Sequence, residues 1–496
     1  MKSYKALEQR FRRISAVGGA LAVLGWDQST MMPDGGAGAR SEQMATLRVV
    51  SHGWLTDPVL GDEIAAAEAG TDRLNDWQRA NLREMKRQWR YATALSPRLV
   101  DAHSRATMEC EMVWRAARRD NDFKAFAKAF APVLDLTREI AAARADALGL
   151  SPYDALLDEY EPDGRSAQID KLFAELGAFL PDFIDRAMTR QAKQPPVLPL
   201  KGPFPVETQR ELGLRFMKTL GFDFRHGRLD VSLHPFSGGV PDDVRITTRY
   251  EPDDFTKSLM GVLHETGHAL YELGLPKTWR GQPVGEARGM VMHESQSLLM
   301  EMQVCRGDAF LDWALPVLRK AFAGEGPAWS DDNLRRVYRQ VRPDLIRVDA
   351  DEVTYPAHVI LRYRLERAML NGDLAIADLP GAWNDGMASL LGVEVPDDRQ
   401  GCMQDIHWPV GSIGYFPTYT LGALAAAQLF AAAKQQDPDI LPAIARGNFK
   451  PLLRWLRLHV HGKGALLSTN ELLKAATGKP LGVAAFKAHL KTRYLS

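Results

Sequence analysis

The chain carries the stretch Leu263-His264-Glu265-Thr266-Gly267-His268-Ala269-Leu270, in which two histidines lie four residues apart within an apolar segment. Pro252 suits the first turn of a helix, and Gly274 suits its end. Positions four apart share one face of a helix, so His264 and His268 can offer imidazole nitrogens to one metal ion. The leucines and valines around them predict that the helix is largely buried.

Glu265 follows the first histidine directly and projects beside the predicted metal site. Two metal-binding histidines and a carboxylate that can accept a proton from an attacking water form the zincin signature, HExxH. With 12 histidines in 496 residues, this motif arises by chance at roughly a few per cent. The alternative interpretation is a pair of hydrogen-bonded core histidines beside a salt-bridged glutamate.

The composition is that of an ordinary soluble globular protein. Lys+Arg and Asp+Glu balance at 62 each, which gives no electrostatic reason to expect binding to nucleic acid or to a membrane surface. The three cysteines, Cys110, Cys305 and Cys402, lie far apart and predict a reducing compartment without disulfides. No apolar run reaches membrane-spanning length and none resembles a signal sequence, so we expect a cytoplasmic protein.

Helical periodicity dominates the first 190 residues and returns after Tyr271. A proline-rich connector follows at 195–205, and residues 222–250 show the alternation of short strands. The sequence therefore predicts a mainly α-helical protein with one small β-sheet next to the metal helix. We expect one catalytic domain over residues 1–496. Within it, the helices up to about 195 would form a lobe or lid, and 222–420 would hold the metal site and substrate groove.

A catalytic zinc ion needs a third protein ligand. The extended motif of the metzincins is excluded, because Tyr271 and Gly274 stand where that class has glycine and histidine. Glu272 lies about 12 Å from His264 along the helix axis, too far for one tetrahedral ion. The next helix, expected to begin near Pro283, is the better source. Four residues there compete on sequence grounds: Glu286, His293, Glu294 and Glu301.

Further motifs give the chain a family resemblance. They are His293-Glu294-Ser295, His234-Pro235-Phe236, Asp243-x-Arg245-x-Thr247, Ile346-Arg347-x-x-Ala350-Asp351, Gly401-x-x-Gln404-Asp405-x-His407-Trp408 and, near the N-terminus, Trp26-Asp27-Gln28. With HExxH, they resemble the thermostable carboxypeptidase 1 (carboxypeptidase Taq) family of metallopeptidases. The resemblance implies that Glu294 is the third ligand, and it leaves His293 as a neighbour of the ligands. Trp26-Asp27-Gln28 is otherwise expected between two helical pieces, as a buried aromatic residue with a capping polar pair.

The resemblance also implies a fold and an activity. The fold would be a two-lobed helical zincin, gluzincin-like and of the neurolysin/ACE type, with a deep groove between the lobes. The enzyme would use Zn²⁺, with Co²⁺ as a competent substitute, and form a homodimer. It would release single C-terminal residues from peptides with a free C-terminus, with broad preference and poor cleavage near proline. Glu265 would serve as the general base.

Other motif residues are candidates for substrate binding. Family resemblance assigns Arg347 to the C-terminal carboxylate of the substrate, whereas the bare sequence favours an ion pair with Asp349 or Asp351. Gln404 would help close one end of the groove.

Two candidates remain open between substrate contact and a structural role. Asp243 and Arg245 would share one face of a strand, where substrate contact and a sheet-edge ion pair are equally compatible with the sequence. A structural role for His234 is at least as compatible as a role in binding or catalysis.

The oxyanion of the tetrahedral intermediate needs a donor besides the metal. Tyr415 and Tyr419 follow His407 in a segment that looks like the Gly-Tyr-x-x-x-Tyr segment of related helical zincins. We therefore expect His407 and Tyr415 to assist catalysis, with Tyr419 as a second candidate that would contact substrate. Packing in the core is the alternative role for either tyrosine. Two other functions stay in view: a helical-zincin oligopeptide endopeptidase, which would not require a free C-terminus, and a helical scaffold with a structural or lost metal site.

Overall fold

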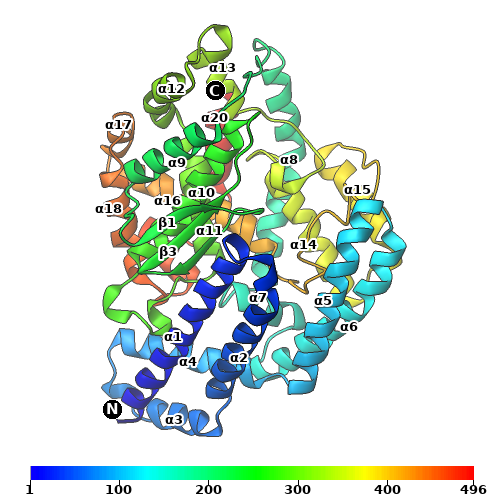
Figure 1. Cartoon of the computed structure of the whole chain (residues 1–496), viewed down its shortest axis with the longest axis vertical. Helices are drawn as coiled ribbons and strands as arrows, with labels where there is room; N and C mark the ends of the chain where they lie inside the picture. Colours follow the sequence, from blue (N-terminus) through cyan, green and yellow to red (C-terminus); the bar gives the residue numbers. More distant parts are fainter. Residues whose placement is uncertain (1) are drawn as a thin grey trace. The chain divides into compact units, whose positions relative to one another are not determined.

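The structure, a computed structural model, describes residues 2–496 and is mainly helical, with one three-stranded sheet in the described chain (Figure 1). The predicted fold class is confirmed. The chain forms two compact units that alternate along the sequence. The first unit comprises Met1–Ala92, Val197–Tyr338 and Ala425–Leu481, and the second comprises Thr93–Pro196, Arg339–Leu424 and Gly482–Ser496. The N-terminal helices are thus divided between the units.

The first unit contains the sheet and the HExxH helix. Its helices are α1 (Lys2–Thr30), α2 (Ala37–Leu55), α3 (Pro58–Glu68), α4 (Asp76–Thr93), α9 (Val206–Leu220), α10 (Phe255–Gly274), α11 (Met290–Leu298), α12 (Asp308–Phe322), α13 (Asp331–Tyr338), α17 (Ile440–Ile444), α18 (Lys450–His459) and α19 (Thr469–Thr477). The second unit is built from α5 (Pro97–Asp120), α6 (Phe123–Leu148), α7 (Pro152–Tyr160), α8 (Ser166–Gln191), α14 (Tyr355–Asn371), α15 (Leu379–Leu391) and α20 (Ala484–Leu495). Helix α16 (Pro417–Gln436) begins in the second unit and ends in the first.

The sheet lies in the predicted region and packs on the HExxH helix. Its strands are β1 (Gly227–Val231), β2 (Ser237–Val240) and β3 (Asp243–Thr248). Strand β3 is central, parallel to β1 and antiparallel to β2. Val244 and Ile246 of β3 are fully buried and share a core cluster with Val262 and Ala269 of α10. This apolar contact fixes the helix that carries the two histidines against the sheet.

Helix α10 begins slightly later than predicted. Pro252 lies before the helix, and Asp254 caps its N-terminus by accepting a hydrogen bond from the backbone of Thr256 at 2.8 Å. Gly267, between the two histidines, lets the next helix come close. A Cβ atom there would lie 2.4 Å from the carbonyl oxygen of Gln296 on α11. The glycine of the motif therefore permits α10 and α11 to pack side by side (Figure 1).

Two local predictions are wrong. The second helix does not begin near Pro283, because Pro283–Gly285 forms only a short 3₁₀ turn and α11 starts at Met290. Trp26 does not lie between two helical pieces, since α1 continues without interruption to Thr30. Trp26 is nevertheless buried, as predicted, and Asp27 beside it pairs with Arg40 at 2.7 Å.

Helix α11 runs directly into a π-helical segment, Leu299–Cys305. Such segments are rare and often occur at functional sites, because the wider turn redirects the side chains that follow. Among the described residues, no helix has both the length and the apolar character needed to cross a membrane.

Candidate functional site

The structure brings three of the predicted metal ligands together. His264 and His268 project from α10 and Glu294 from α11, and one ligand atom of each lies within 4.8 Å of the others. Nε2 of His268 is 3.5 Å from Oε2 of Glu294. His268 and Glu294 are only 8% and 5% exposed. Of the competing residues on the second helix, Glu294 is the one that joins the two histidines.

This set of donors fits a divalent transition metal. Two imidazoles and one carboxylate leave a coordination position open, as in catalytic zinc sites. Glu265 is 7% exposed, and its Oε2 atom is buried without a hydrogen-bond partner. A buried carboxylate oxygen without a partner is unfavourable in a site with no further role, so its presence beside the ligands indicates a chemical function.

Each histidine of the pair is held through its other ring nitrogen. Nδ1 of His264 is 3.0 Å from Oε2 of Glu301. Nδ1 of His268 is 2.7 Å from Nδ1 of His293, whose Nε2 is 2.9 Å from Oε1 of Glu272. Since the carboxylate can only accept, His293 donates from Nε2 and accepts at Nδ1. His268 then donates from Nδ1, which leaves the lone pair of its Nε2 available for a metal.

The electrostatics of the site favour a cation. Burial raises the pKa of Glu265 to about 7. Burial, with His293 close by, lowers the pKa of His268 to about 4. Burial alone would also lower the pKa of His264, but the carboxylates of Glu301, Glu294 and Glu265 outweigh it and raise that pKa to about 10. Without a metal the carboxylates thus retain a proton on His264, and a divalent ion can replace that charge.

The strand residues predicted to contact substrate lie in the same unit. Arg245 pairs with Asp243 at 2.6 Å, and its guanidinium lies 4.4 Å from the ring centroid of Trp26. The ion pair is present but not at a sheet edge, because β3 is the central strand. His234 is exposed and lies just beyond β1. Substrate contact by these three residues stays a prediction.

In the second unit Arg347 belongs to an arginine cluster, which we define as Arg347, Arg362 and Asp405. Nη2 of Arg347 is 2.8 Å from Oδ1 of Asp405, and Nε of Arg362 is 2.6 Å from Oδ2. Asp405, rather than Asp349 or Asp351 as the bare sequence suggested, is therefore the ion-pair partner of Arg347. The Arg362 side chain is fully buried, and that of Arg347 is 7% exposed.

Gln404 supports this cluster through the backbone. Its Oε1 accepts from the backbone N–H of Arg347 at 2.9 Å, and its Nε2 donates to the carbonyls of Leu345 and Gln400 at 3.0 and 2.9 Å. These bonds engage the whole amide group in holding Arg347. They indicate a positioning role for Gln404, while the predicted contact with substrate stays untested.

The predicted oxyanion donors also lie in the second unit. Nε2 of His407 is 3.2 Å from the hydroxyl of Tyr419, and the ring of Tyr415 packs edge-on against Tyr419 at 5.1 Å. Burial and the nearby Arg347 lower the pKa of His407 to about 3, so this imidazole is neutral. A neutral imidazole and two phenols can donate hydrogen bonds to a developing oxyanion.

Sequence reasoning missed Arg362 and Arg306, although each is bound into one of these sites, and it considered Glu301 only as a metal ligand. Asp405 lies within a quoted motif, so a charge partner for Arg347 could have been sought there. Arg362 carries no sequence signal, because only the fold brings α14 to Asp405.

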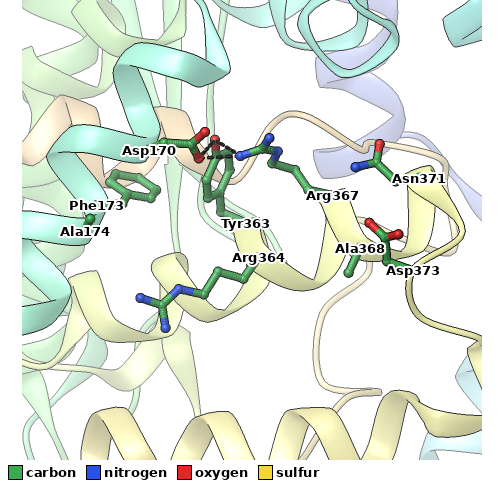
Figure 2. A pocket seen from close by; sticks show the side chains of 9 residues that line it. All are labelled: Asp170, Phe173, Ala174, Tyr363, Arg364, Arg367, Ala368, Asn371 and Asp373. Carbon is green, nitrogen blue, oxygen red and sulfur yellow. Dashed lines mark hydrogen bonds and ion pairs between the residues drawn. The ribbon is translucent and has the colours of Figure 1, made fainter.

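A separate cavity of about 420 Å³ lies between α8 and α14 of the second unit (Figure 2). Asp170 lines this cavity and pairs with Arg367. Its carboxylate also accepts a hydrogen bond from the hydroxyl of Tyr363 at 2.7 Å. None of the predicted site residues lines it. The cavity therefore gives no alternative location for the chemistry.

Comparison with known proteins agrees with this geometry. The family described as carboxypeptidase Taq (M32) metallopeptidase matches residues 6–494. The chain belongs to this family. It is a metallocarboxypeptidase.

Relatives of this M32 carboxypeptidase match along its whole length. Thermostable carboxypeptidase 1 of Thermus thermophilus is 41% identical over 487 residues, which cover 96% of this chain and 94% of the relative. The protein of the same name from Pyrococcus furiosus is 37% identical over 500 residues, covering 100% and 99%. The solved structure of Trypanosoma cruzi metallocarboxypeptidase 1 is 41% identical and covers 100% of both chains with a TM-score of 0.98.

Proposed function

We propose that this M32 enzyme is a zinc-dependent exopeptidase that releases single amino acids from peptides with a free C-terminus. The observation that carries the proposal is the donor set of His264, His268 and Glu294 with the unpartnered carboxylate of Glu265 beside it. When bound there, zinc would polarise the scissile carbonyl and acidify the attacking water. Co²⁺ shares the tetrahedral preference of such sites and is proposed as a competent substitute.

Glu265 is proposed as the proton carrier of the reaction. Its Oε2 accepts the proton of the attacking water and then returns it to the nitrogen of the leaving amino acid. A carboxyl group whose pKa burial raises to about 7 suits this role, because it can take up and release a proton near neutral pH. Burial of this oxygen also keeps bulk water from competing for the proton.

Arg347 is proposed to bind the C-terminal carboxylate. Two guanidiniums share the single carboxylate of Asp405, so the arginine cluster retains one positive charge in a buried setting. A substrate carboxylate neutralises that charge, and a planar guanidinium recognises it with directional hydrogen bonds. Gln404 would act with Arg347 by fixing its backbone.

The remaining site residues are proposed in lesser roles. His407 and Tyr415 donate to the oxyanion, and Tyr419 orients His407 through their hydrogen bond. Asp243, Arg245 and His234 would contact the substrate from the first unit. That proposal has less support, because both carboxylate oxygens of Asp243 already accept hydrogen bonds from Arg245.

Further properties are proposed from the family resemblance. Broad residue preference is expected, with poor cleavage beside proline, whose fixed φ and missing N–H restrict binding of an extended backbone. A homodimer is proposed and is checked by sedimentation equilibrium. Cytoplasmic location is proposed because all three cysteines are buried and free.

Mass spectrometry of the products tests the proposed function. The enzyme is stripped with a chelator, reconstituted with Zn²⁺ or Co²⁺, and incubated with a peptide blocked at its N-terminus and free at its C-terminus. Loss of residues one at a time from the C-terminus, absent without metal, would support the proposal. Internal cuts would contradict it and favour an oligopeptide endopeptidase.

A further inference from the structure

The support of His264 differs from that of the other histidine. Nδ1 of His264 faces Oε2 of Glu301 at 3.0 Å. A carboxylate only accepts hydrogen bonds, so Nδ1 must carry the proton and donate it. This leaves the lone pair of Nε2 for a metal, which is the tautomer that a metal-binding imidazole requires.

Glu301 is itself fixed from the other side. Its Oε1 accepts a hydrogen bond from Nη2 of Arg306 at 2.7 Å. Arg306 also donates from Nη1 to the carbonyl oxygen of Tyr338 at 3.2 Å. The side chains of Glu301 and Arg306 are 13% and 18% exposed. Both oxygens of Glu301 are therefore engaged in a mostly buried network that holds the carboxylate against His264.

The position of Glu301 excludes it as a ligand but suits it as a support. It lies in the π-helical segment Leu299–Cys305, which continues the helix that carries Glu294. One continuous helical stretch thus provides a metal ligand and, seven residues later, the partner of another ligand. Glu301 does not join the group of atoms that can hold a metal in the described chain.

We propose that Glu301, fixed by Arg306, is a positioning residue that sets the tautomer and ring orientation of His264 for metal binding. The proposal rests on the metal site of the proposed function. A carboxylate partner also makes the imidazole a stronger donor to a metal. His268 has the imidazole of His293 as its partner instead of a carboxylate, so the two histidines are not equivalent.

Arg306 makes this arrangement compatible with the charge of the site. Glu294 and Glu265 already place carboxylates near His264. A further unpaired carboxylate would add repulsion among buried acids. Because Arg306 pairs with Glu301, the support adds no net charge to the metal centre.

The test measures metal affinity without substrate. Metal-free wild type and E301Q are titrated with Zn²⁺ in competition with a chromophoric chelator. The amide of E301Q cannot accept from both Arg306 and His264, so one hydrogen bond is lost. We expect the Kd for Zn²⁺ to rise 10- to 100-fold. The visible absorption bands of the Co²⁺-loaded variant should also shift, since they report ligand geometry.

Glu84 provides a matched control. It is 4% exposed and pairs with Arg288 at 2.8 Å in the same unit. Its hydrogen bonds go to Arg83, Arg87 and Arg288 rather than to any of the three proposed ligands. E84Q should lower the melting temperature and leave the Kd for Zn²⁺ within threefold of wild type. If the loss of a buried carboxylate acted only through the structure, the Kd for Zn²⁺ would change by the same factor in E301Q and E84Q.

R306Q gives a second route if E301Q does not fold. It leaves Glu301 in place but removes its fixing partner, and we expect the Kd to rise about threefold to tenfold. Wild-type Zn²⁺ affinity and Co²⁺ spectra in folded E301Q or R306Q would overturn the proposal. Failure of the proposed function gives a different result. In that case metal-loaded wild type would release no C-terminal residues, whatever the Kd of E301Q for Zn²⁺.

Discussion

The metal centre and the arginine cluster have opposite charge imbalances. Three carboxylates, those of Glu265, Glu294 and Glu301, lie around His264, whereas Arg306 is the permanent cation paired there. In the arginine cluster, two guanidiniums share the one carboxylate of Asp405. Buried ionisable groups are normally paired, so each imbalance indicates a missing partner of the opposite sign.

The two imbalances correspond to two parts of the proposed reaction. An excess of carboxylates suits a divalent metal, and an excess of guanidinium suits the free carboxylate at the end of a peptide. Each site is largely closed to solvent, which strengthens both attractions relative to water. The comparison therefore predicts different consequences when each site is altered.

The largest effect is expected at Glu265. E265Q removes the proton acceptor but leaves the three proposed ligands intact, so kcat should fall by about 10⁴-fold. Metal content should stay at the wild-type level, because the glutamine is nearly isosteric. Steady-state kinetics together with elemental analysis by mass spectrometry measure both. Near-normal turnover in metal-loaded E265Q would remove Glu265 from its assigned role.

Asp405 should determine the stability of the second unit. D405N leaves two buried guanidiniums facing each other and should cost about 3–5 kcal/mol of unfolding free energy at pH 7. D170N is the control, because Asp170 pairs with Arg367 at a partly exposed site, and it should cost less than about 1 kcal/mol. Denaturant unfolding measures both, and equal costs would contradict the account of the cluster.

The ion pairs of Asp405 should make the stability of the fold depend on pH. Burial alone would raise the pKa of Asp405, but the charges of Arg362 and Arg347 outweigh it and hold that pKa well below the usual value. Its stabilisation is therefore fully present above about pH 4, the unfolded pKa, and is lost progressively as the pH falls further. Melting temperatures from pH 7 to pH 2 should show the gap between wild type and D405N narrowing in acid. A constant gap would contradict this linkage.

Loss of Arg347 should affect substrate recognition more than folding. R347A should lower kcat/KM by about 10²-fold, mainly through KM, because Arg362 still pairs with Asp405. R347K should recover only part of this loss, since an ammonium lacks the planar geometry of a guanidinium. R367A is the control in the same unit and should keep wild-type kinetics. Unchanged KM in R347A would return Arg347 to a structural ion pair.

The smallest difference separates the two tyrosines. Y415F should lower kcat by up to about 10²-fold with little change in KM, as expected for loss of an oxyanion donor. Y419F should cost less than about tenfold, because the hydroxyl of Tyr419 is bound to His407 and acts indirectly. Rate measurements at saturating substrate compare them. The reverse order would exchange the two roles.

The sequence predicted the helical fold and the metal helix because both depend on local patterns. Apolar periodicity located α10, and the spacing of His264 and His268 follows from helix geometry alone. Periodicity could not choose among the acids of the second helix. That choice depends on how closely α11 approaches, which Gly267 permits, and only the family resemblance favoured Glu294.

Features that depend on tertiary packing were not predictable in the same way. The partner of Arg347 is Asp405, 58 residues away, rather than a neighbouring aspartate. The helix start at Met290 was missed because Pro283 also suits a 3₁₀ turn. Glu301 was a competitor for the metal on sequence grounds, and only the π-helical segment shows that it faces the far side of His264.

One measurement tests the central claim most directly. Values of kcat/KM are compared for two peptides that differ only in a C-terminal carboxylate or amide, with metal-loaded wild type and with R347A. The account predicts that wild type prefers the carboxylate by at least about 10²-fold and that R347A loses most of this preference. Equal rates on both peptides in wild type would contradict it, because the excess guanidinium would then have no carboxylate to bind.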